Sequence, residues 1–142
     1  RLVPDRPAPP LATLESALYA DDLVAAEKFY MDVIGLKLVL RQPGRHVFFR
    51  VGGSIHLIFN PAATTKAQAG QADLQVPAHG SAGAGHYCFA VPAEALETWK
   101  DYLESHSIPL EAEIRWPNGA RSIYVRDPAG NSIEFAEPAL WD

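Results

Sequence analysis

The sequence predicts an α+β fold in which two tandem βαβββ modules form a curved, mixed-sheet cup. The first observation is an internal repeat, since residues 44–50 (GRHVFFR) resemble residues 120–126 (ARSIYVR). The second is that a Gly-containing turn follows each of these segments and leads into a short apolar strand, at residues 55–59 and 133–136. The third is that a strand, a helix and another strand are predicted before each segment.

Composition limits the function classes. A chain of 142 residues that is 48% hydrophobic can bury one substantial core. Its net charge of −5, without any charged block, argues against nucleic acid and against an anionic membrane surface. No apolar run approaches the roughly 18 residues of a membrane span, and no leader is evident, so we expect a cytoplasmic protein. The single cysteine, Cys88, excludes an internal disulfide framework and a Cys-rich zinc site.

The first module is predicted over residues 13–60. Before it, residues 1–12 are rich in proline and lack periodicity, which indicates an extended arm. A strand over 14–20 leads to Asp21 or Asp22, either of which can cap a helix. Apolar residues then recur at spacings of three and four until Gly35, which is expected to end the helix: Leu23, Ala26, Phe29, Tyr30 and Val33. Three strands complete the module: 36–41, 47–51 and 54–59.

The second module is predicted over residues 85–137, after a linker at 61–84 that is rich in Ala, Gly, Gln and Pro. A strand at 85–91 precedes Pro92, which suits a first helical turn. One helix face is apolar: Leu96, Trp99, Tyr102 and Leu103. Strands follow at 110–115, 121–126 and 132–136, the last two joined by a tight Asp-Pro-Ala-Gly turn. Residues 13–142 are therefore expected to form a single domain.

The repeat places titratable side chains at matching strands. Glu15 in the first strand of copy one corresponds to His86 in copy two, and His56 in the last strand corresponds to Glu134. Two neutral imidazoles and two carboxylates suit a divalent ion such as Zn, Ni, Mn, Co or Fe. Such a set leaves open coordination positions for two adjacent oxygens of a substrate, which the ion would polarise.

Three motifs resemble the vicinal-oxygen-chelate superfamily, which includes glyoxalase, bleomycin-resistance and extradiol-dioxygenase proteins. The strongest is residues 121–134 (RSIYVRDPAGNSIE), an aromatic strand, an Asp-Pro-x-Gly turn and a strand ending in Glu. The others are Asp22-Leu23 leading to the Phe-Tyr and Ile-Gly-Leu segments of 29–36, and residues 85–91 (GHYCFAV). The resemblance covers about residues 13–137.

This resemblance implies metal ligands on the first and fourth strand of each copy, which fall on Glu15, His56, His86 and Glu134. The last two match the usual residue types, whereas Glu15 and His56 look exchanged. The resemblance also implies a homodimer, in which a site draws ligands from both chains and to which the arm contributes. The first hypothesis is accordingly a metal-dependent, glyoxalase-like lyase or isomerase that acts on a small substrate with vicinal oxygens, with Glu15 or Glu134 as the base.

Other interpretations stay open. A metal-free protein of the bleomycin-resistance kind would sequester a drug or metabolite by stacking it on aromatic residues. If one Glu does not ligate, two His and one carboxylate remain, which is the ligand set of an Fe(II) extradiol-type dioxygenase. His86 and His56 could also be hydrogen-bonded structural residues, and Glu134 a solvent-facing strand charge. Weaker candidates for substrate contact are Tyr19, His79, Arg121 and Tyr124, although Arg121 could instead form a structural ion pair.

Overall fold

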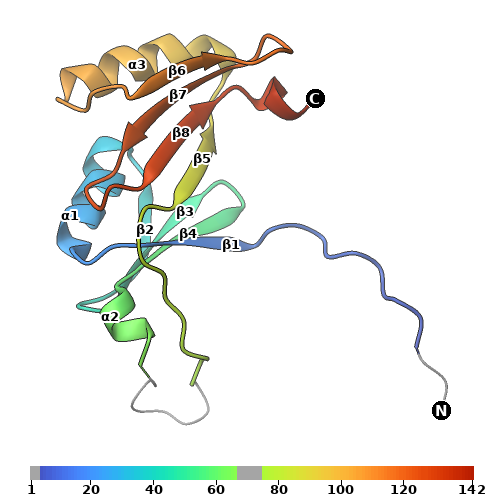
Figure 1. The fold of residues 1–142 in the computed structure, drawn as a ribbon, viewed down its shortest axis with the longest axis vertical. Helices are drawn as coiled ribbons and strands as arrows, with labels where there is room; N and C mark the ends of the chain where they lie inside the picture. The colour runs from blue at the N-terminus through green and yellow to red at the C-terminus, as the bar shows by residue number, and fades with distance from the viewer. Residues whose placement is uncertain (1–3, 67–74) are drawn as a thin grey trace.

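The computed structural model describes residues 4–66 and 75–142 and contains two four-stranded mixed sheets. Sheet A has the strand order β1-β4-β3-β2, and sheet B has the order β5-β8-β7-β6. Figure 1 shows the two βαβββ modules, the first in blue to green and the second in yellow to red. The predicted α+β fold of two tandem modules is confirmed.

The first module contains strands β1 (Glu15–Tyr19), β2 (Lys37–Gln42), β3 (His46–Val51) and β4 (Ser54–Phe59), with helix α1 (Leu23–Lys28) after β1. β1 runs parallel to β4, and the other pairs are antiparallel. All four strands lie within about two residues of their predicted positions. The crossover through α1 is required because parallel strands cannot be joined by a tight turn.

The helix of the first module departs from the predicted regular spacing. Asp22 caps it, because its carboxylate accepts a hydrogen bond from the backbone N–H of Ala25 at 3.0 Å. After Lys28 the chain forms one π-helical turn, Phe29–Val33, in which the N–H of Ile34 bonds to the carbonyl of Phe29. Gly35, with a φ of +87°, then ends the helical segment as predicted.

The second module contains β5 (His86–Ala90), β6 (Ala112–Arg115), β7 (Arg121–Arg126) and β8 (Ser132–Ala136), with α3 (Leu96–Ser105) after a short 3₁₀ turn, Ala93–Ala95. β5 runs parallel to β8, as β1 does to β4. The predicted linker begins with a short helix, α2 (Pro61–Thr64), which the sequence pattern did not indicate and which Asn60 caps. Part of that linker, 67–74, lies outside the described residues. No helix among residues 4–66 and 75–142 has the length and apolar character needed to cross a membrane.

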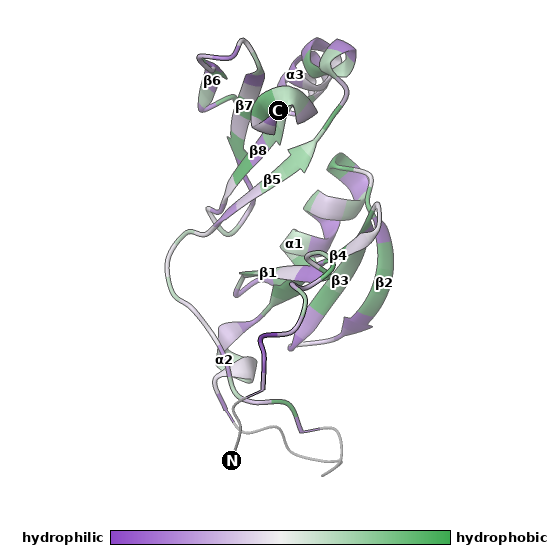
Figure 2. Ribbon diagram, turned by 90° about the vertical axis from the view of Figure 1, so that its right-hand side faces the viewer, coloured by the Kyte–Doolittle hydropathy of each residue, from purple (hydrophilic) through white to green (hydrophobic). Residues whose placement is uncertain are grey.

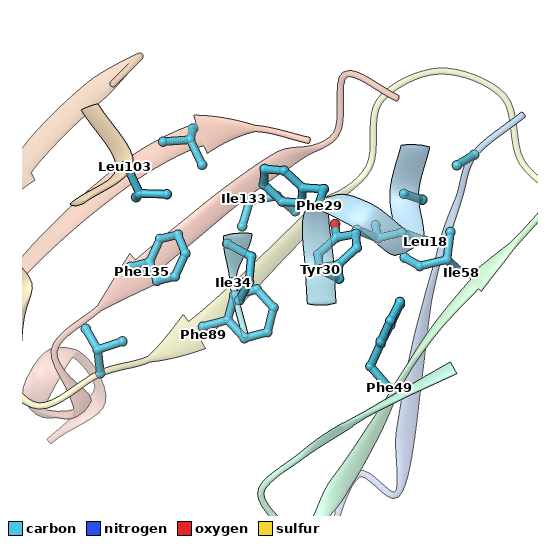
Figure 3. Close-up of a cluster of buried hydrophobic side chains, with 14 of the residues drawn as sticks. Leu18, Phe29, Tyr30, Ile34, Phe49, Ile58, Phe89, Leu103, Ile133 and Phe135 are labelled. Atoms are coloured by element: carbon cyan, nitrogen blue, oxygen red, sulfur yellow. The ribbon is translucent and has the colours of Figure 1, made fainter. Parts of the chain in front are cut away.

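One hydrophobic core joins the two modules. Each sheet has an inner face that is buried, and side chains from both inner faces belong to a single cluster. Figure 3 shows Phe29, Tyr30 and Ile34 from the first helical segment between Phe49 and Ile58 of sheet A and Phe89, Ile133 and Phe135 of sheet B. Figure 2 shows apolar residues, in green, along the strands of both modules. Burial of this continuous surface is the main force that holds the modules together.

A buried polar contact fixes the two modules to each other. The hydroxyl of Tyr30, which is 0% exposed, donates to Asp127 Oδ2 over 2.7 Å. Asp127 belongs to the Asp-Pro-Ala-Gly turn and also accepts hydrogen bonds from the N–H groups of Ala129 and Asn131. The Asn131 amide donates to Asp127 Oδ2 and to the carbonyl of Tyr19 in the first module. The turn therefore serves as a connector between the modules as well as a hairpin loop.

The shared core determines where the other faces of the sheets point. Because both inner faces pack toward the common core, the outer faces of sheets A and B lie on opposite sides of it. Strand register assigns Glu15, Leu57 and Phe48 to the outer face of sheet A. It assigns His86, Glu134 and Tyr124 to the outer face of sheet B. Within one chain, the outer faces of the two sheets therefore face away from each other.

Replacing Tyr30 with Phe is expected to lower the free energy of unfolding by about 1–3 kcal/mol, because it leaves a buried carboxylate oxygen without one of its donors. Urea unfolding at neutral pH measures the loss. Tyr19→Phe removes a hydroxyl from a contact in the linker and serves as the matched control. Equal losses of unfolding free energy in the two variants would show that the Tyr30–Asp127 hydrogen bond stabilises the fold no more than an ordinary contact.

Candidate functional site

His86 and Glu134 form a polar pair on the outer face of sheet B. His86 begins β5, and Glu134 lies in the middle of β8, the parallel neighbour of β5. His86 Nε2 lies 3.1 Å from Glu134 Oε1. The side chain of His86 is 52% exposed, whereas that of Glu134 is only 7% exposed. The structure therefore brings these two predicted residues together, with the imidazole open to an incoming ligand.

The second nitrogen of His86 faces Ser132. Nδ1 lies 3.2 Å from the carbonyl oxygen of Ser132, which can only accept a hydrogen bond, and 3.3 Å from its hydroxyl, which can also donate. A ring protonated on Nε2 donates to the Glu134 carboxylate, whereas a neutral ring that directs its Nδ1 proton to the carbonyl presents its Nε2 lone pair there. Two acceptors 3.1 Å apart are held stably only when a proton or a metal ion lies between them. The pair thus fits a cation, with the orientation typical of a metal-bound histidine.

Glu134 is held in place by residues that the sequence reasoning missed. The Ser122 hydroxyl, which is fully buried, donates to Glu134 Oε2 over 2.6 Å. The indole N–H of Trp116 in turn donates to Ser122 Oγ over 2.8 Å. The signal for Ser122 was in the sequence, because it alternates with Tyr124 on the strand next to Glu134. The contact to Trp116 depends on the β6–β7 turn and has no sequence signal.

Tyr124 and Cys88 flank the pair on the same face. The Tyr124 ring is nearly parallel to the His86 ring, with centroids 6.2 Å apart. Burial and the nearby Glu134 carboxylate raise the pKa of the Tyr124 phenol, so it remains a hydrogen-bond donor at neutral pH. Packing and the same carboxylate raise the pKa of the Cys88 thiol to about 12, so Cys88 is not a thiolate nucleophile at neutral pH.

The outer face of sheet A carries the remaining candidates of the first module. Glu15 is exposed at the start of β1. The Tyr19 hydroxyl lies 2.7 Å from His79 Nδ1, so the linker segment with His79 packs against this face. Both residues lie next to Phe59, with ring centroids 6.2 Å away for Tyr19 and 4.6 Å away for His79. A cavity of about 550 Å³ lies over this face, between the strands and residues 76–79.

His56 is not part of either outer face, so its prediction as a metal ligand is wrong. It pairs with Ser16 and Phe49 on the inner face of sheet A, opposite to Glu15. Its side chain is 0% exposed, and its ring lies 4.8 Å from Tyr30 and 4.0 Å from Tyr87, measured between centroids. Neither ring nitrogen has a hydrogen-bond partner among the described residues. His56 is therefore a core residue at the junction of the modules.

The error has a simple origin in strand register. The turn before β8 is one residue longer than the turn before β4. In sheet A, Arg50 pairs with Ile55, five positions later in the chain. In sheet B, the equivalent pair is Arg126 and Ser132, which are six positions apart. A shift of one residue moves every side chain to the other face. In the structure, the position of Glu134 corresponds to Leu57 rather than His56. By the same registers, Tyr124 corresponds to Phe48 and Ser122 to His46.

The predicted ligands consequently do not meet in one chain. Glu15 lies on the outer face of sheet A, and His86 and Glu134 lie on the outer face of sheet B, across the shared core. Over residues 4–66 and 75–142, no three His, Cys, Asp or Glu side chains are grouped as a metal site. Of the four predicted ligands, the structure brings only His86 and Glu134 together.

Arg121 is turned away from the outer face of sheet B. Its guanidinium bonds to Glu137 at 2.9 Å, to Glu97 at 3.3 Å and to the carbonyl of Ala93 at 3.2 Å. The backbone N–H and guanidinium of Arg121 hold the pKa of Glu137 below its ordinary value. These contacts tie β7 to the segment before α3, so the alternative of a structural ion pair is the one that the geometry supports.

The fold agrees with the family comparison. The chain belongs to the glyoxalase/bleomycin resistance protein/dioxygenase superfamily, whose model matches residues 12–135. No curated protein matches the chain.

Among solved structures, a lactoylglutathione lyase from Agrobacterium tumefaciens is 49% identical, with a TM-score of 0.88, and the match covers 94% of this chain and 98% of that one. A glyoxalase/bleomycin resistance protein/dioxygenase from Nocardioides is 21% identical, with a TM-score of 0.71 over 92% of this chain and 85% of that one. A glyoxalase family protein from Bacillus anthracis is 19% identical, with a TM-score of 0.68 over 93% and 98%. The last two show the same fold.

Burial of His56 makes folding dependent on pH. Burial lowers the pKa of His56 from its ordinary value of 6.5 to about 4 in the folded chain. The unfolded chain binds the proton of His56 more tightly than the folded chain does. The stability that the neutral, buried ring contributes is therefore complete above pH 6.5 and is lost as the pH falls toward 4. We expect a loss of about 2 kcal/mol between pH 7 and pH 5.

Urea unfolding of the natural chain and of His56→Phe across this range tests the expectation, since the variant should show a flatter dependence. In the folded natural chain, the ring protons of His56 should titrate near pH 4 by NMR. A His56 midpoint near 6.5 would contradict the assignment of a neutral core histidine.

Proposed function

We propose that this protein is a metal-dependent, glyoxalase-type lyase or isomerase that acts on a small substrate with two adjacent oxygens. The observation that carries the proposal is the His86–Glu134 pair, in which an imidazole nitrogen and a carboxylate oxygen lie 3.1 Å apart on an accessible face. Membership of the superfamily and the 49% identity to a structure named lactoylglutathione lyase support the reaction class.

In this proposal, His86 and Glu134 hold a divalent ion, and the Ser122 and Trp116 contacts orient the carboxylate. The ion, when bound, supplies a Lewis acid that polarises the oxygens of the substrate. Tyr124 lies beside the pair as a donor for a developing negative charge. Glu134, or Glu15 contributed by another chain, is the base that moves a proton when its oxygen is free of the ion.

We further propose that the site is completed in a homodimer. Glu15 is exposed and cannot reach His86 within its own chain, because the shared core lies between them. The N-terminal arm extends away from the modules (Figure 1), and its Leu11 and Leu14 are 103% and 75% exposed. Trp141 near the C-terminus is 90% exposed. Exposed large apolar residues, together with a pair that lacks further ligands in its own chain, favour association of two copies, so that an outer face of sheet A meets an outer face of sheet B.

A second candidate function is a metal-free binding protein of the bleomycin-resistance kind. The specific observation in its favour is the outer face of sheet A, where the rings of His46, Phe48 and Phe59 line the cavity beside Glu15. The two functions differ in their requirement for His86 and Glu134, so a metal assay separates them.

Protein purified without chelator is expected to contain about one divalent ion per site, as measured by elemental analysis. His86→Ala and Glu134→Gln should each remove the ion, because each deletes a donor from the pair. His106→Ala, which removes an exposed imidazole at the end of α3, is the matched control and should retain it. Absence of metal in the natural chain, or equal metal content in all variants, would favour the metal-free binding protein.

Sharing of the site between chains predicts complementation. Glu15→Ala and His86→Ala proteins should each bind little metal, whereas a mixed and reassembled sample should regain about a quarter of the natural content, since half of the dimers would carry one intact site of two. Mixing Glu134→Gln with His86→Ala should give no recovery, because both changes lie on the same half of the site. Recovery in the second mixture, or none in the first, would contradict a site built from Glu15 of one chain and His86 of the other.

A further inference from the structure

A groove of about 320 Å³ lies where the two modules meet, away from both outer faces of the sheets. Residues 32–35, at the end of the first helical segment, form the wall that module one contributes. The wall from module two comes from α3 and the residue before it: Ala95, Thr98, Trp99 and Tyr102. We call this feature the junction groove. Its two walls belong to different modules, so a bound molecule would contact both.

The wall from module two is one stripe of a helix. Its four residues follow one another at spacings of three, four and seven, which places them on the same face. The indole of Trp99 packs against Phe135 of β8, with ring centroids 5.0 Å apart and planes 25° apart. It also meets the ring of Tyr102 edge-on at 5.6 Å. Trp99 is only half-buried, so part of a large, firmly held aromatic surface remains available in the groove.

The wall from module one is the C-terminal end of a helix. The segment that begins at Leu23 passes through the π-helical turn and stops at Gly35. The last carbonyl groups of a helix carry a partial negative charge, because the peptide dipoles align along its axis. The hydroxyl of Tyr102 donates to one of these groups, the carbonyl of Val33, over 2.7 Å. This end of the groove is therefore an acceptor surface that favours donors and positive charge.

Asp32 adds a formal negative charge to the same wall. Its residue is exposed, and no Lys, Arg or His is among the described residues that line the groove. Over residues 4–66 and 75–142, no salt bridge reaches its carboxylate. Asp101, which is also exposed, lies three residues after Thr98 on α3 and thus beside the groove. The charges at the groove consequently favour a cation, whereas its apolar walls favour an apolar body.

The floor and the opening limit the size of the ligand. Ile34 is 8% exposed and closes the groove against the core. Gly35 leaves it open, because a Cβ atom at this position would meet no other atom within 4 Å. The volume lies near the lower end of the roughly 300–1,000 Å³ that is typical of ligand pockets. The groove therefore suits a compact molecule rather than an extended chain.

We propose that the junction groove binds a small organic ammonium ion. The apolar body of the ion lies against Trp99, and its nitrogen lies near Asp32 and the end of the helix. An ammonium group close to an indole is also attracted by the negative face of the ring. Because the ion binds the folded junction of the two modules, it stabilises the folded chain as well. The site needs no metal and is separate from the His86–Glu134 pair, so its test is independent of the proposed function.

Three probes that share a cyclohexyl ring and differ in the charge of a short arm test the proposal: cyclohexylmethylammonium, cyclohexylmethanol and cyclohexanecarboxylate. Each is titrated into the full chain at pH 7 and low salt, without metal. The ammonium ion should bind about tenfold more tightly than the alcohol, and the carboxylate should bind most weakly. The NMR signals of the three indole N–H groups locate the site, since that of Trp99 should shift, whereas those of Trp116 and Trp141 should not. Trp116→Phe and Trp141→Phe assign the signals without altering the groove.

Asp32→Asn removes the charge of the groove and keeps its shape. It should bring the affinity for the ammonium ion to within about twofold of that for the alcohol, and leave the affinity for the alcohol unchanged. Asp21→Asn, which removes an exposed carboxylate outside the groove, is the matched control and should keep the full preference. Absence of binding by the ammonium ion, equal affinity of the three probes, or an undiminished preference in Asp32→Asn would overturn the proposal. Shifts of the Trp116 or Trp141 signal in place of Trp99 would also overturn it.

Discussion

The packing of the two inner sheet faces against one another is the constraint on which the rest of the structure depends. Phe29 and Tyr30 of the first helical segment enter the same core as Phe89 and Phe135 of the second module. The Tyr30–Asp127 hydrogen bond adds orientation to this non-directional contact, since a buried carboxylate must keep its donors. Because the inner faces share one core, the outer faces point away from each other, and Glu15 is kept apart from His86 and Glu134 within one chain.

This division explains why one chain holds a polar pair without a complete metal centre. His86 and Glu134 lie on adjacent parallel strands, and Ser122 on the next strand fixes the carboxylate. Glu15, the remaining candidate ligand, is held on the other side of the core. Association of two copies would place unlike halves together, with ligands on one side and aromatic rings on the other. The proposed chemistry would then belong to the assembly rather than to the single chain.

The two modules share a common strand topology but differ in side-chain chemistry. Leu57 and Phe48 occupy the positions that Glu134 and Tyr124 occupy in the second module. Copy one consequently contributes a surface of low charge that can hold an apolar group, while copy two contributes groups that bind charge.

The sequence by itself determined the module order, the strands, and the pairing of His86 with Glu134, because alternation and the Asp-Pro-Ala-Gly turn are local patterns that few folds satisfy. Only the tertiary structure decided the position of His56. The turn in the second copy is one residue longer, so His56 and Glu134 lie on opposite faces of their sheets. The Ser-Ile dipeptide that precedes both residues conceals that shift in the sequence. It also decided that Arg121 pairs with Glu137 and that Trp116 reaches Ser122. These contacts join segments whose separation in space is set by how the strands twist and pack, which no local pattern specifies.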